Sequence, residues 1–379
     1  MDLGQQRVYE FELWTKDGQR IADISALAFN RQFTLTRNEA EQLTFSLDLF
    51  AFESYCANAL GGADPKVLIA PYVTDVKVKR NGVYLFGTQV VDVSFNLQQD
   101  NSRAGSIGGT GQNYIVTITA TGYLNLLKDR YVTKTYTQTE RTAIAADLIA
   151  TTQAQPNGSV GMTIASNQYG TGKLSDRTYQ SDEVKSKIQE LAQLSDSPFD
   201  FGFDYMKNFR TYSQIGARRL DVNLIYGGAL GNVAGFAMSR SALTLFNKIY
   251  GVGSGFGSDQ LSSTKGDVIS QVNYYVREKV VQFNSVVLQD TLDVNTQTEV
   301  DQAKDILELP VVTITGKEIP ANAFLVPGDR VPLRVMDHKW LDNVNGLYRI
   351  EQVDVTIDEN DFESAVQLTF DSFGVSQGE

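Results

Sequence analysis

The feature that most constrains this chain is residues 114–131, where a strand pattern gives way to a helical one. Apolar residues alternate with threonines from Val116 to Ala120, which is the period of a half-buried strand. After Gly122 the leucines recur at helical spacing. The sequence before this segment has mostly strand patterns, and the sequence after it has helical and then strand patterns. These patterns predict an α+β chain that is mainly β.

Other strands are predicted from the same alternation. Residues 43–49 alternate leucine and phenylalanine with polar side chains. Residues 75–80 and 83–86 flank Asn81-Gly82, a pair that is typical of a two-residue hairpin turn. Residues 50–66 contain paired glycines and a proline, and we expect them to be irregular.

Three helices are predicted from capping signals. Residues 137–140 and 296–299 both read Thr-Gln-Thr-Glu, which fits a capping box. The second box predicts a helix near 296–309 that ends before Pro310. Ser181 is expected to cap a third helix.

A short internal echo suggests a duplicated β module. Val91-Asp92-Val93 and Val353-Asp354-Val355 each end a unit made of a turn and two strands. Chance is an equally good explanation for so short a match. Taken with the change of period, the echo predicts a β domain at 1–131, an inserted α/β domain at 132–225, and a second β domain with one helix at 226–379.

Composition excludes several kinds of protein. The chain has 379 residues and a net charge of −12, whereas a protein that binds duplex nucleic acid usually has a basic face. Cys56 is the only cysteine, so neither a disulfide within the chain nor a zinc site built from cysteines is possible. No secretory signal and no membrane-spanning apolar run are visible, so we expect a soluble protein made in a cytoplasm.

The residues give no strong signal for catalysis, a cofactor or a metal. A catalytic triad would have to use His338, the only histidine, and we expect both it and Cys56 to have packing or surface roles. Residues 170–173 lack the spacing of a phosphate-binding loop, and the glycine-rich residues 251–258 precede a polar loop rather than a helix. The acidic residues 358–361 lack the spacing of a calcium-binding loop and predict a polar turn.

Six sequence segments occur in a characteristic order. They are FELWTKDGQRIADIS (11–25), NEAEQLTFSLDL (38–49), RNGVYLFGTQVVDV (80–93), VTITATGYLNLLKDRYV (116–132), the helical pair ERTAIAADLIATTQ (140–153) and KSKIQELAQLSDSPFDF (185–201), and SVVLQDTLDVNTQTEVDQAKDILE (285–308) followed by LVPGDRV (325–331). This order resembles the hub proteins of phage tail tips and baseplates. Each motif is structural rather than catalytic, and together they cover most of the chain.

The resemblance implies two tail-tube-like β barrels per chain, with an inserted mixed α/β domain. It also implies a homotrimeric ring that joins the sixfold tail tube, or a distal tail protein, to a threefold tip. The expected partners are a tail-tube ring or distal tail protein, the tape measure protein, and tip, spike or receptor-binding proteins, with DNA only passing through the lumen. The expected location is the virion tail tip, after assembly in the host cytoplasm.

Two other functions stay open. One is a receptor- or carbohydrate-binding virion protein. The other is a cell-wall hydrolase of the tail tip, which would need a suitably spaced pair among the 45 acidic residues. Because the sequence ends at Glu379, soon after its last predicted strand, we expect no hydrolase domain after the hub. The resemblance favours a structural protein without enzyme activity.

Overall fold

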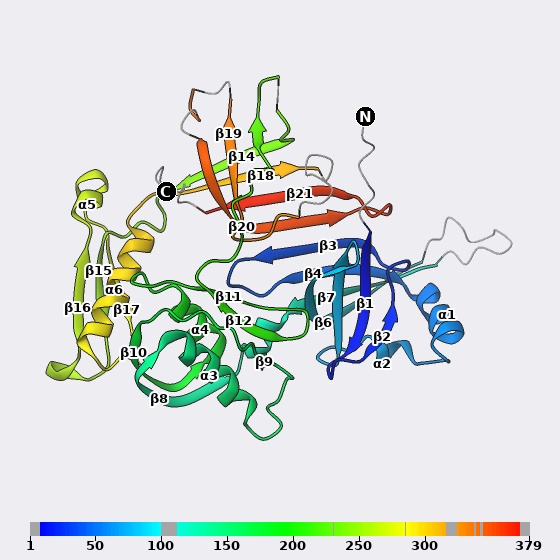
Figure 1. Cartoon of the computed structure of the whole chain (residues 1–379), viewed down its shortest axis with the longest axis horizontal. Coiled ribbons are helices and arrows are strands. Elements are labelled where there is room, and N and C mark those ends of the chain that lie inside the picture. Colours follow the sequence, from blue (N-terminus) through cyan, green and yellow to red (C-terminus); the bar gives the residue numbers. More distant parts are fainter. Residues whose placement is uncertain are drawn as a thin grey trace.

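The structure is a computed structural model, and it describes residues 8–99, 112–229, 231–284, 286–315, 324–336, 339–341 and 344–371. It is mainly β, as predicted, with one thirteen-stranded sheet and three smaller sheets. Figure 1 shows the large sheet above and to the right, a mixed α/β region below it, and a small sheet with a long helix on the left.

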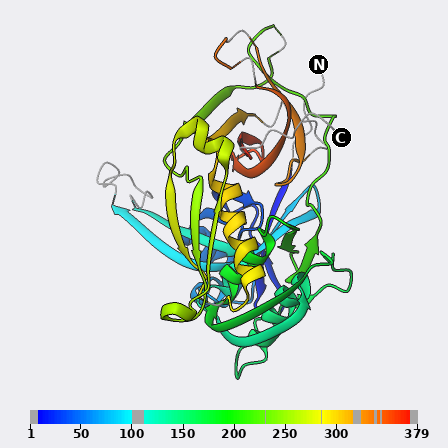
Figure 2. The ribbon, with the colours of Figure 1, turned by 90° about the vertical axis from the view of Figure 1, so that its left-hand side faces the viewer.

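The N-terminal part of the large sheet has seven strands, in the order β3-β4-β7-β6-β5-β1-β2. Their bounds are β1 Tyr9–Thr15, β2 Arg20–Asp23, β3 Phe29–Thr36, β4 Gln42–Asp48, β5 Thr74–Arg80, β6 Val83–Gln99 and β7 Gln112–Gly122. Helices α1 (Leu49–Ala59) and α2 (Pro65–Leu68) connect β4 to β5. The long β6–β7 pair projects from the body of the molecule in Figure 2.

The C-terminal part of the large sheet continues from β3. It consists of β13 Leu224–Tyr226, β14 Gly235–Ser241, β18 Leu307–Ile314, β19 Arg330–Val335, β20 Asn345–Ile357 and β21 Glu363–Phe370. One half of β20 pairs with β19, and the other half lies between β21 and β3. Strand β20 therefore joins the two parts of the chain into one sheet.

The predicted strand patterns form the centre of the N-terminal part. In the antiparallel pair β4–β7, Phe45 lies opposite Ile118 and Leu47 lies opposite Val116, and all four side chains are buried. The hairpin at Asn81-Gly82 forms as predicted. Both of its turn residues have positive φ (51° and 77°), which asparagine and glycine tolerate best.

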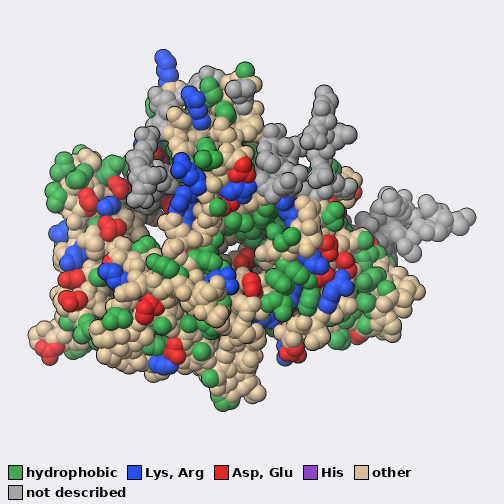
Figure 3. Space-filling view, viewed as in Figure 1, with side chains coloured by type: hydrophobic (Ala, Val, Ile, Leu, Met, Phe, Trp, Pro, Cys, Tyr) green, Lys and Arg blue, Asp and Glu red, His purple; other side chains and the backbone are tan. Residues whose placement is uncertain are grey.

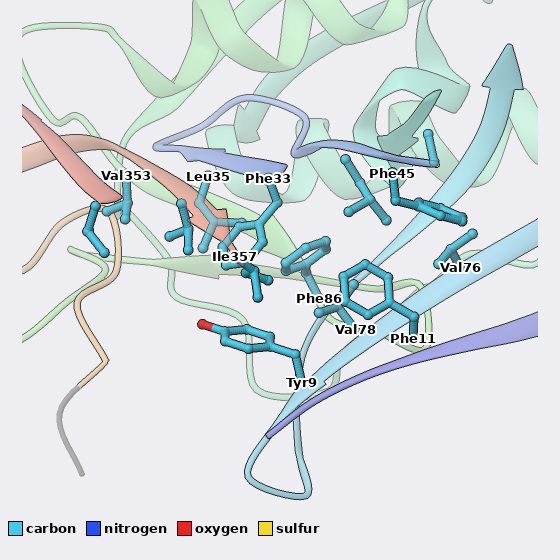
Figure 4. Close-up of a cluster of buried hydrophobic side chains, with 14 of the residues drawn as sticks. Tyr9, Phe11, Phe33, Leu35, Phe45, Val76, Val78, Phe86, Val353 and Ile357 are labelled. Carbon is cyan, nitrogen blue, oxygen red and sulfur yellow. The ribbon is translucent and has the colours of Figure 1, made fainter. Parts of the chain in front are cut away.

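The two parts of the sheet share one hydrophobic core. The ring of Phe33 on β3 packs against Tyr9, Phe86 and Phe324, with ring centroids 5.2–6.3 Å apart. Figure 4 shows side chains from β1, β3, β5, β6 and β20 pointing toward one another in this core. The strand pairs form a path from β14 to β2. Whether either part closes into a barrel therefore remains a prediction, as does the division at residues 131 and 225.

The α/β region has its own apolar cluster. It contains the 3-10 helix η2 (Tyr123–Leu127), β8 Tyr131–Glu140, α3 Arg141–Gln153, β9 Thr163–Ile164, β10 Leu174–Glu183, α4 Val184–Ala192, β11 Asp200–Phe203 and β12 Asn208–Tyr212. The helical turn predicted after Gly122 is η2. Its side chains Leu124 and Leu127 are buried in this second cluster.

A third region lies between β14 and β18 in the sequence. Its sheet has the order β16-β15-β17, with β15 Lys248–Val252, β16 Ser262–Gly266 and β17 Glu278–Gln282. The short 3-10 helix η3 (Gly257–Asp259) and helix α5 (Val268–Tyr274) connect these strands, and helix α6 (Gln289–Ala303) packs on β15 and β16. Figure 2 shows α6 crossing in front of the rest of the chain.

Two predictions about helix position are wrong. The predicted helix near 296–309 begins seven residues earlier, at Gln289, and Thr296 lies inside it, where its hydroxyl donates to the carbonyl of Leu292 (2.7 Å). Leu307 and Pro310 instead belong to strand β18. Residues 50–66, expected to be irregular, include most of α1 and the start of α2, because Asp48 and Asp64 cap these helices through their carboxylates.

The other predicted caps are also misplaced. Residues 137–140 end strand β8, and Glu140 caps α3 by accepting from the N–H of Ala143 (2.9 Å). Ser181 lies in β10 with a left-handed backbone, and α4 begins after Glu183. Helices α3 and α4 themselves lie where their apolar spacing places them.

Candidate assembly interface

The residues weighed for catalysis or ligand binding have structural roles where they are described. Cys56 is a buried free thiol on α1, and burial raises its pKa. Residues 358–361 form the turn between β20 and β21, in which Asp358 accepts from the N–H groups of Asn360 and Phe362. His338 lies outside the described residues. Those that are described contain no cluster of three potential metal ligands, and no helix among them is long and apolar enough to span a membrane.

Each of the two glycine-containing segments has one residue with a structural contact to a neighbouring element. In residues 170–173, Thr171 donates to Glu140, the residue that caps α3, so this segment is the predicted loop. In residues 251–258, Gly251 lies in β15 against α6, and a Cβ there would lie 2.0 Å from Oγ1 of Thr296. Gly251 therefore lets the sheet approach the helix closely.

A buried carboxylate joins the three parts of the chain. Asp200, at the start of β11, accepts from Nη1 of Arg37 in the N-terminal part (3.0 Å) and from Nη2 of Arg349 in the C-terminal part (2.5 Å). It also accepts from the N–H of Ile215 (2.7 Å). Because Asp200 is almost fully buried, these contacts compensate for the loss of its hydration.

A second buried cluster joins the two ends of the sequence. Oε1 of Glu363 on β21 accepts from Nε of Arg80 on β5 (2.8 Å) and from the hydroxyl of Tyr9 on β1 (2.6 Å). All three residues are buried, and burial raises the pKa of Tyr9. The two clusters make the large sheet and the α/β region one connected body.

Helix α5 is held to the molecule by polar contacts. The buried amide of Asn247 donates to the carbonyl of Tyr275 (2.7 Å) and accepts from the N–H of Arg277 (2.8 Å). Asp267 caps the helix by accepting from the N–H of Ser270 (2.8 Å), and the Ser270 hydroxyl donates to the carbonyl of Lys304. Both ends of the helix are therefore anchored.

The outer side of α5 is apolar. Ser270 is buried, whereas Val268, Ile269, Val272 and Tyr275 are 73–86% exposed. This is the reverse of an ordinary surface helix, which buries its apolar side chains. Together with Val276 we call these exposed residues the α5 patch, and Figure 3 shows hydrophobic side chains gathered at this corner.

An apolar patch on an anchored helix is typical of a surface that contacts another protein. The patch was not predicted from the sequence, although the apolar residues of VISQVNYYV (268–276) are a visible signal for it. The patch is the strongest candidate interface in the part of the molecule that the structure describes.

Comparison of the sequence with protein-family models and with curated proteins finds no match. Solved structures do match over almost the whole chain. The 43 kDa tail protein of prophage MuSo2 from Shewanella oneidensis is 15% identical, with a TM-score of 0.62 over 95% of this chain and 98% of that one. A tail protein from Neisseria meningitidis is 12% identical, with a TM-score of 0.61 over 96% of each chain.

This chain has the fold of phage tail proteins. The family resemblance predicted from the sequence is thus confirmed at the level of the fold. A chain of the Francisella PdpA–VgrG complex is also similar, at 8% identity and a TM-score of 0.53, and the match covers all of this chain and 60% of that one.

Proposed function

We propose that this protein is the structural hub of a phage tail tip or baseplate. Three copies would form a ring that joins the sixfold tail tube, or a distal tail protein, to a threefold tip, and the ring would leave a channel for DNA. The observation that carries this proposal is the likeness to tail proteins over the full length of the chain, rather than over one domain.

The way in which the parts of the chain are joined supports a structural role. The N- and C-terminal parts share one sheet and one core, and the buried carboxylates of Asp200 and Glu363 join them across distant segments. If each part supplies one tube-like module, three chains would present six modules, which is the number that a sixfold tube requires. The shared sheet would keep the two modules of a chain in fixed register.

The α5 patch supports contact between copies. A ring with threefold symmetry uses a head-to-tail interface, in which one surface of each copy meets a different surface of the next. We assign the α5 patch to one side of this interface because its helix is anchored at both ends and its apolar residues are exposed.

The proposed role needs no catalytic residue, and we propose that the protein is not an enzyme. Its partners would be the ring above it, the tape measure protein, and the tip, spike or receptor-binding proteins below. The likeness to a chain from a complex of PdpA with VgrG supports a role in such an assembly. Its place would be the virion tail tip, reached after assembly in the host cytoplasm.

Sedimentation velocity tests the proposal, first with the purified chain and then with a candidate distal tail ring. The expected result is a species with three times the mass of one chain, alone or on the ring. A chain that stays monomeric in both experiments would contradict the hub function. Release of sugars from peptidoglycan by the purified chain would contradict its non-enzymatic character.

A further inference from the structure

A large cavity lies where the N-terminal sheet meets the α/β region. Its volume is about 880 Å³, and its walls come from β5, η2 and the turn between β11 and β12. Its charged lining consists of five cations and three carboxylates: Lys16, Lys77, Lys128, Arg130, Lys207, Asp17, Asp75 and Asp129. A basic cavity is unexpected in a chain whose net charge is −12.

One of the buried cations in this cavity is neutralised. Nζ of Lys207 lies 2.7 Å from Oδ2 of Asp75 and also donates to the carbonyl of Lys16 (3.1 Å). Asp75 accepts further hydrogen bonds from Gln89 and from the hydroxyl of Tyr123. Asp75 and Lys207 thus form a buried ion pair whose hydrogen-bonding groups are largely satisfied.

The second buried cation, Lys77, has no such partner. Its side chain is almost fully buried, and its Nζ lies 3.6 Å from the centroid of the Trp14 ring and 5.4 Å from that of Tyr205. Its polar contact is the thioether sulfur of Met206, at 3.2 Å. Among the described residues, no carboxylate lies within 4 Å of it, and the carboxylate of Asp75 pairs with Lys207. A buried ammonium group without an anion is costly.

We propose that this cavity binds a carboxylate, which pairs with the ammonium group of Lys77. The buried groups Lys77, Lys207 and Asp75 sum to one positive charge, so one monoanion balances them. The other charged lining residues, Lys16, Lys128 and Arg130 with Asp17 and Asp129, are more exposed, so solvent screens their charges and the buried groups decide the charge of the ligand. The carboxylate could belong to a small organic acid or to an acidic side chain of another polypeptide. This proposal does not rest on the hub function.

The charges around Lys77 add a dependence on pH. Burial and the nearby Lys207 lower the pKa of Lys77, while Asp75, Glu12 and Asp204 raise it by a smaller amount. A bound carboxylate favours the protonated amine, so we expect binding to be tightest at a pH above the pKa of the carboxylic acid and below that of the Lys77 amine. Its affinity should fall as the pH rises through the lowered pKa of Lys77.

Fluorescence titration of the full chain tests the proposal. In a Trp340→Phe background, Trp14 is the only tryptophan, and it lies directly over Lys77. The probes are acetate, inorganic phosphate and an acetylated peptide that contains two glutamates. We expect saturable changes with acetate and with the peptide, and weaker ones with phosphate. Equal affinity per carboxylate would indicate a small acid, and much tighter binding of the peptide would indicate a polypeptide partner.

Three variants make the test specific. Lys77→Met should weaken carboxylate binding about ten- to hundredfold, because it removes one charge-assisted hydrogen bond. Lys77→Arg should keep binding and remove its dependence on pH, because arginine stays charged. Lys66→Met, on the exposed helix α2, is the control and should bind as the parent does. Each variant is first shown to melt cooperatively.

Three results would overturn the proposal. They are the absence of saturable binding by either carboxylate probe, equal binding by parent and Lys77→Met, and tighter binding of phosphate than of the carboxylates. If Lys77→Met fails to fold, Lys77→Arg remains the deciding variant, and loss of binding in a folded arginine variant would also contradict the proposal.

Discussion

Strand β5 and helix α5 differ in which kind of side chain they bury and which they expose. One face of β5 carries Asp75, Lys77 and Lys79, yet Asp75 and Lys77 are buried under the turn between β11 and β12. Helix α5 carries valine and isoleucine side chains, and no described segment covers them. The charged surface is covered, and the apolar surface is open.

The difference shows that whether a side chain is buried depends on which other segment, or which other chain, packs over it, and not only on its polarity. On β5, the buried carboxylate of Asp75 is paired with Lys207, and the ammonium group of Lys77 lies against the ring of Trp14. Exposed apolar side chains on α5 have no such compensation within one chain. We infer that their cover comes from a second copy.

The largest expected effect follows from placing a charge on the α5 patch. Val272→Asp should abolish the trimer, because the carboxylate would have to be buried in the interface. The melting temperature of the single chain should stay the same, since Val272 is 81% exposed. Sedimentation velocity with the ring partner measures the first effect and thermal denaturation the second. Val272→Ile is the matched control and should form the trimer. An unchanged trimer in Val272→Asp would exclude the patch from the interface.

The second prediction tests a buried charge, the carboxylate of Asp200. Asp200→Ala leaves Arg37 and Arg349 without their shared buried acceptor, and should lower the free energy of unfolding by about 3–5 kcal/mol. Urea denaturation measures this loss. The matched control is Asp221→Ala, which removes an exposed aspartate paired with Arg219 and should have little effect. Equal losses in the two variants would contradict the idea that Asp200 joins the parts of the chain.

The carboxylate of Glu41 makes the stability of the protein depend on pH. Its Oε2 lies against Gly122, and burial, with a smaller effect of Glu39, raises the pKa of Glu41 from 4.5 to about 7. Between these values the native state keeps a proton that the unfolded chain has released. The free energy of unfolding should therefore fall as the pH rises through this window.

Glu41→Gln should remove this dependence and stabilise the protein by about 1–3 kcal/mol at pH 8. Urea denaturation at pH 5 and pH 8 measures both effects. Glu53→Gln, at an exposed site on α1, is the control and should leave the pH profile of the parent. A Glu41→Gln variant whose pH profile matches that of the parent would contradict the raised pKa.

The smallest expected effect concerns the contact of β15 with α6. Gly251→Ala places a methyl group against Thr296, and should lower the free energy of unfolding by about 1 kcal/mol through overpacking. Thermal denaturation measures the change. Gly202→Ala, in strand β11 with open space around it, is the control. Equal melting temperatures for the two variants would show that the α6 contact is not tight.

Much of the large sheet could be predicted from local patterns. Alternation along β4 and β7, and the Asn81-Gly82 turn, depend on neighbouring residues, and the structure confirms them. The start of α6 could not be placed, because a capping box also occurs by chance inside a helix, as at Thr296. The environment of Lys77 could not be predicted either. Its cover comes from Tyr205 and Met206, more than a hundred positions away in the sequence.

The candidate interface was missed for a related reason. A short helix with outward apolar residues looks like an ordinary buried helix in the sequence. The hydrogen bonds that hold α5 with its apolar side outward come from Asn247 and Lys304, which lie in other segments of the chain. The resemblance to tail hub proteins indicated a mainly β chain with the fold of phage tail proteins, which is confirmed, but it identified no individual residue.

Cryo-electron microscopy of the purified protein, alone and with a candidate distal tail ring, tests the central proposal most directly. We expect a ring with threefold symmetry, a central channel, six similar β modules, and α5 at the contact between copies. A particle without a channel in both samples, or a ring in which α5 faces solvent, would contradict it.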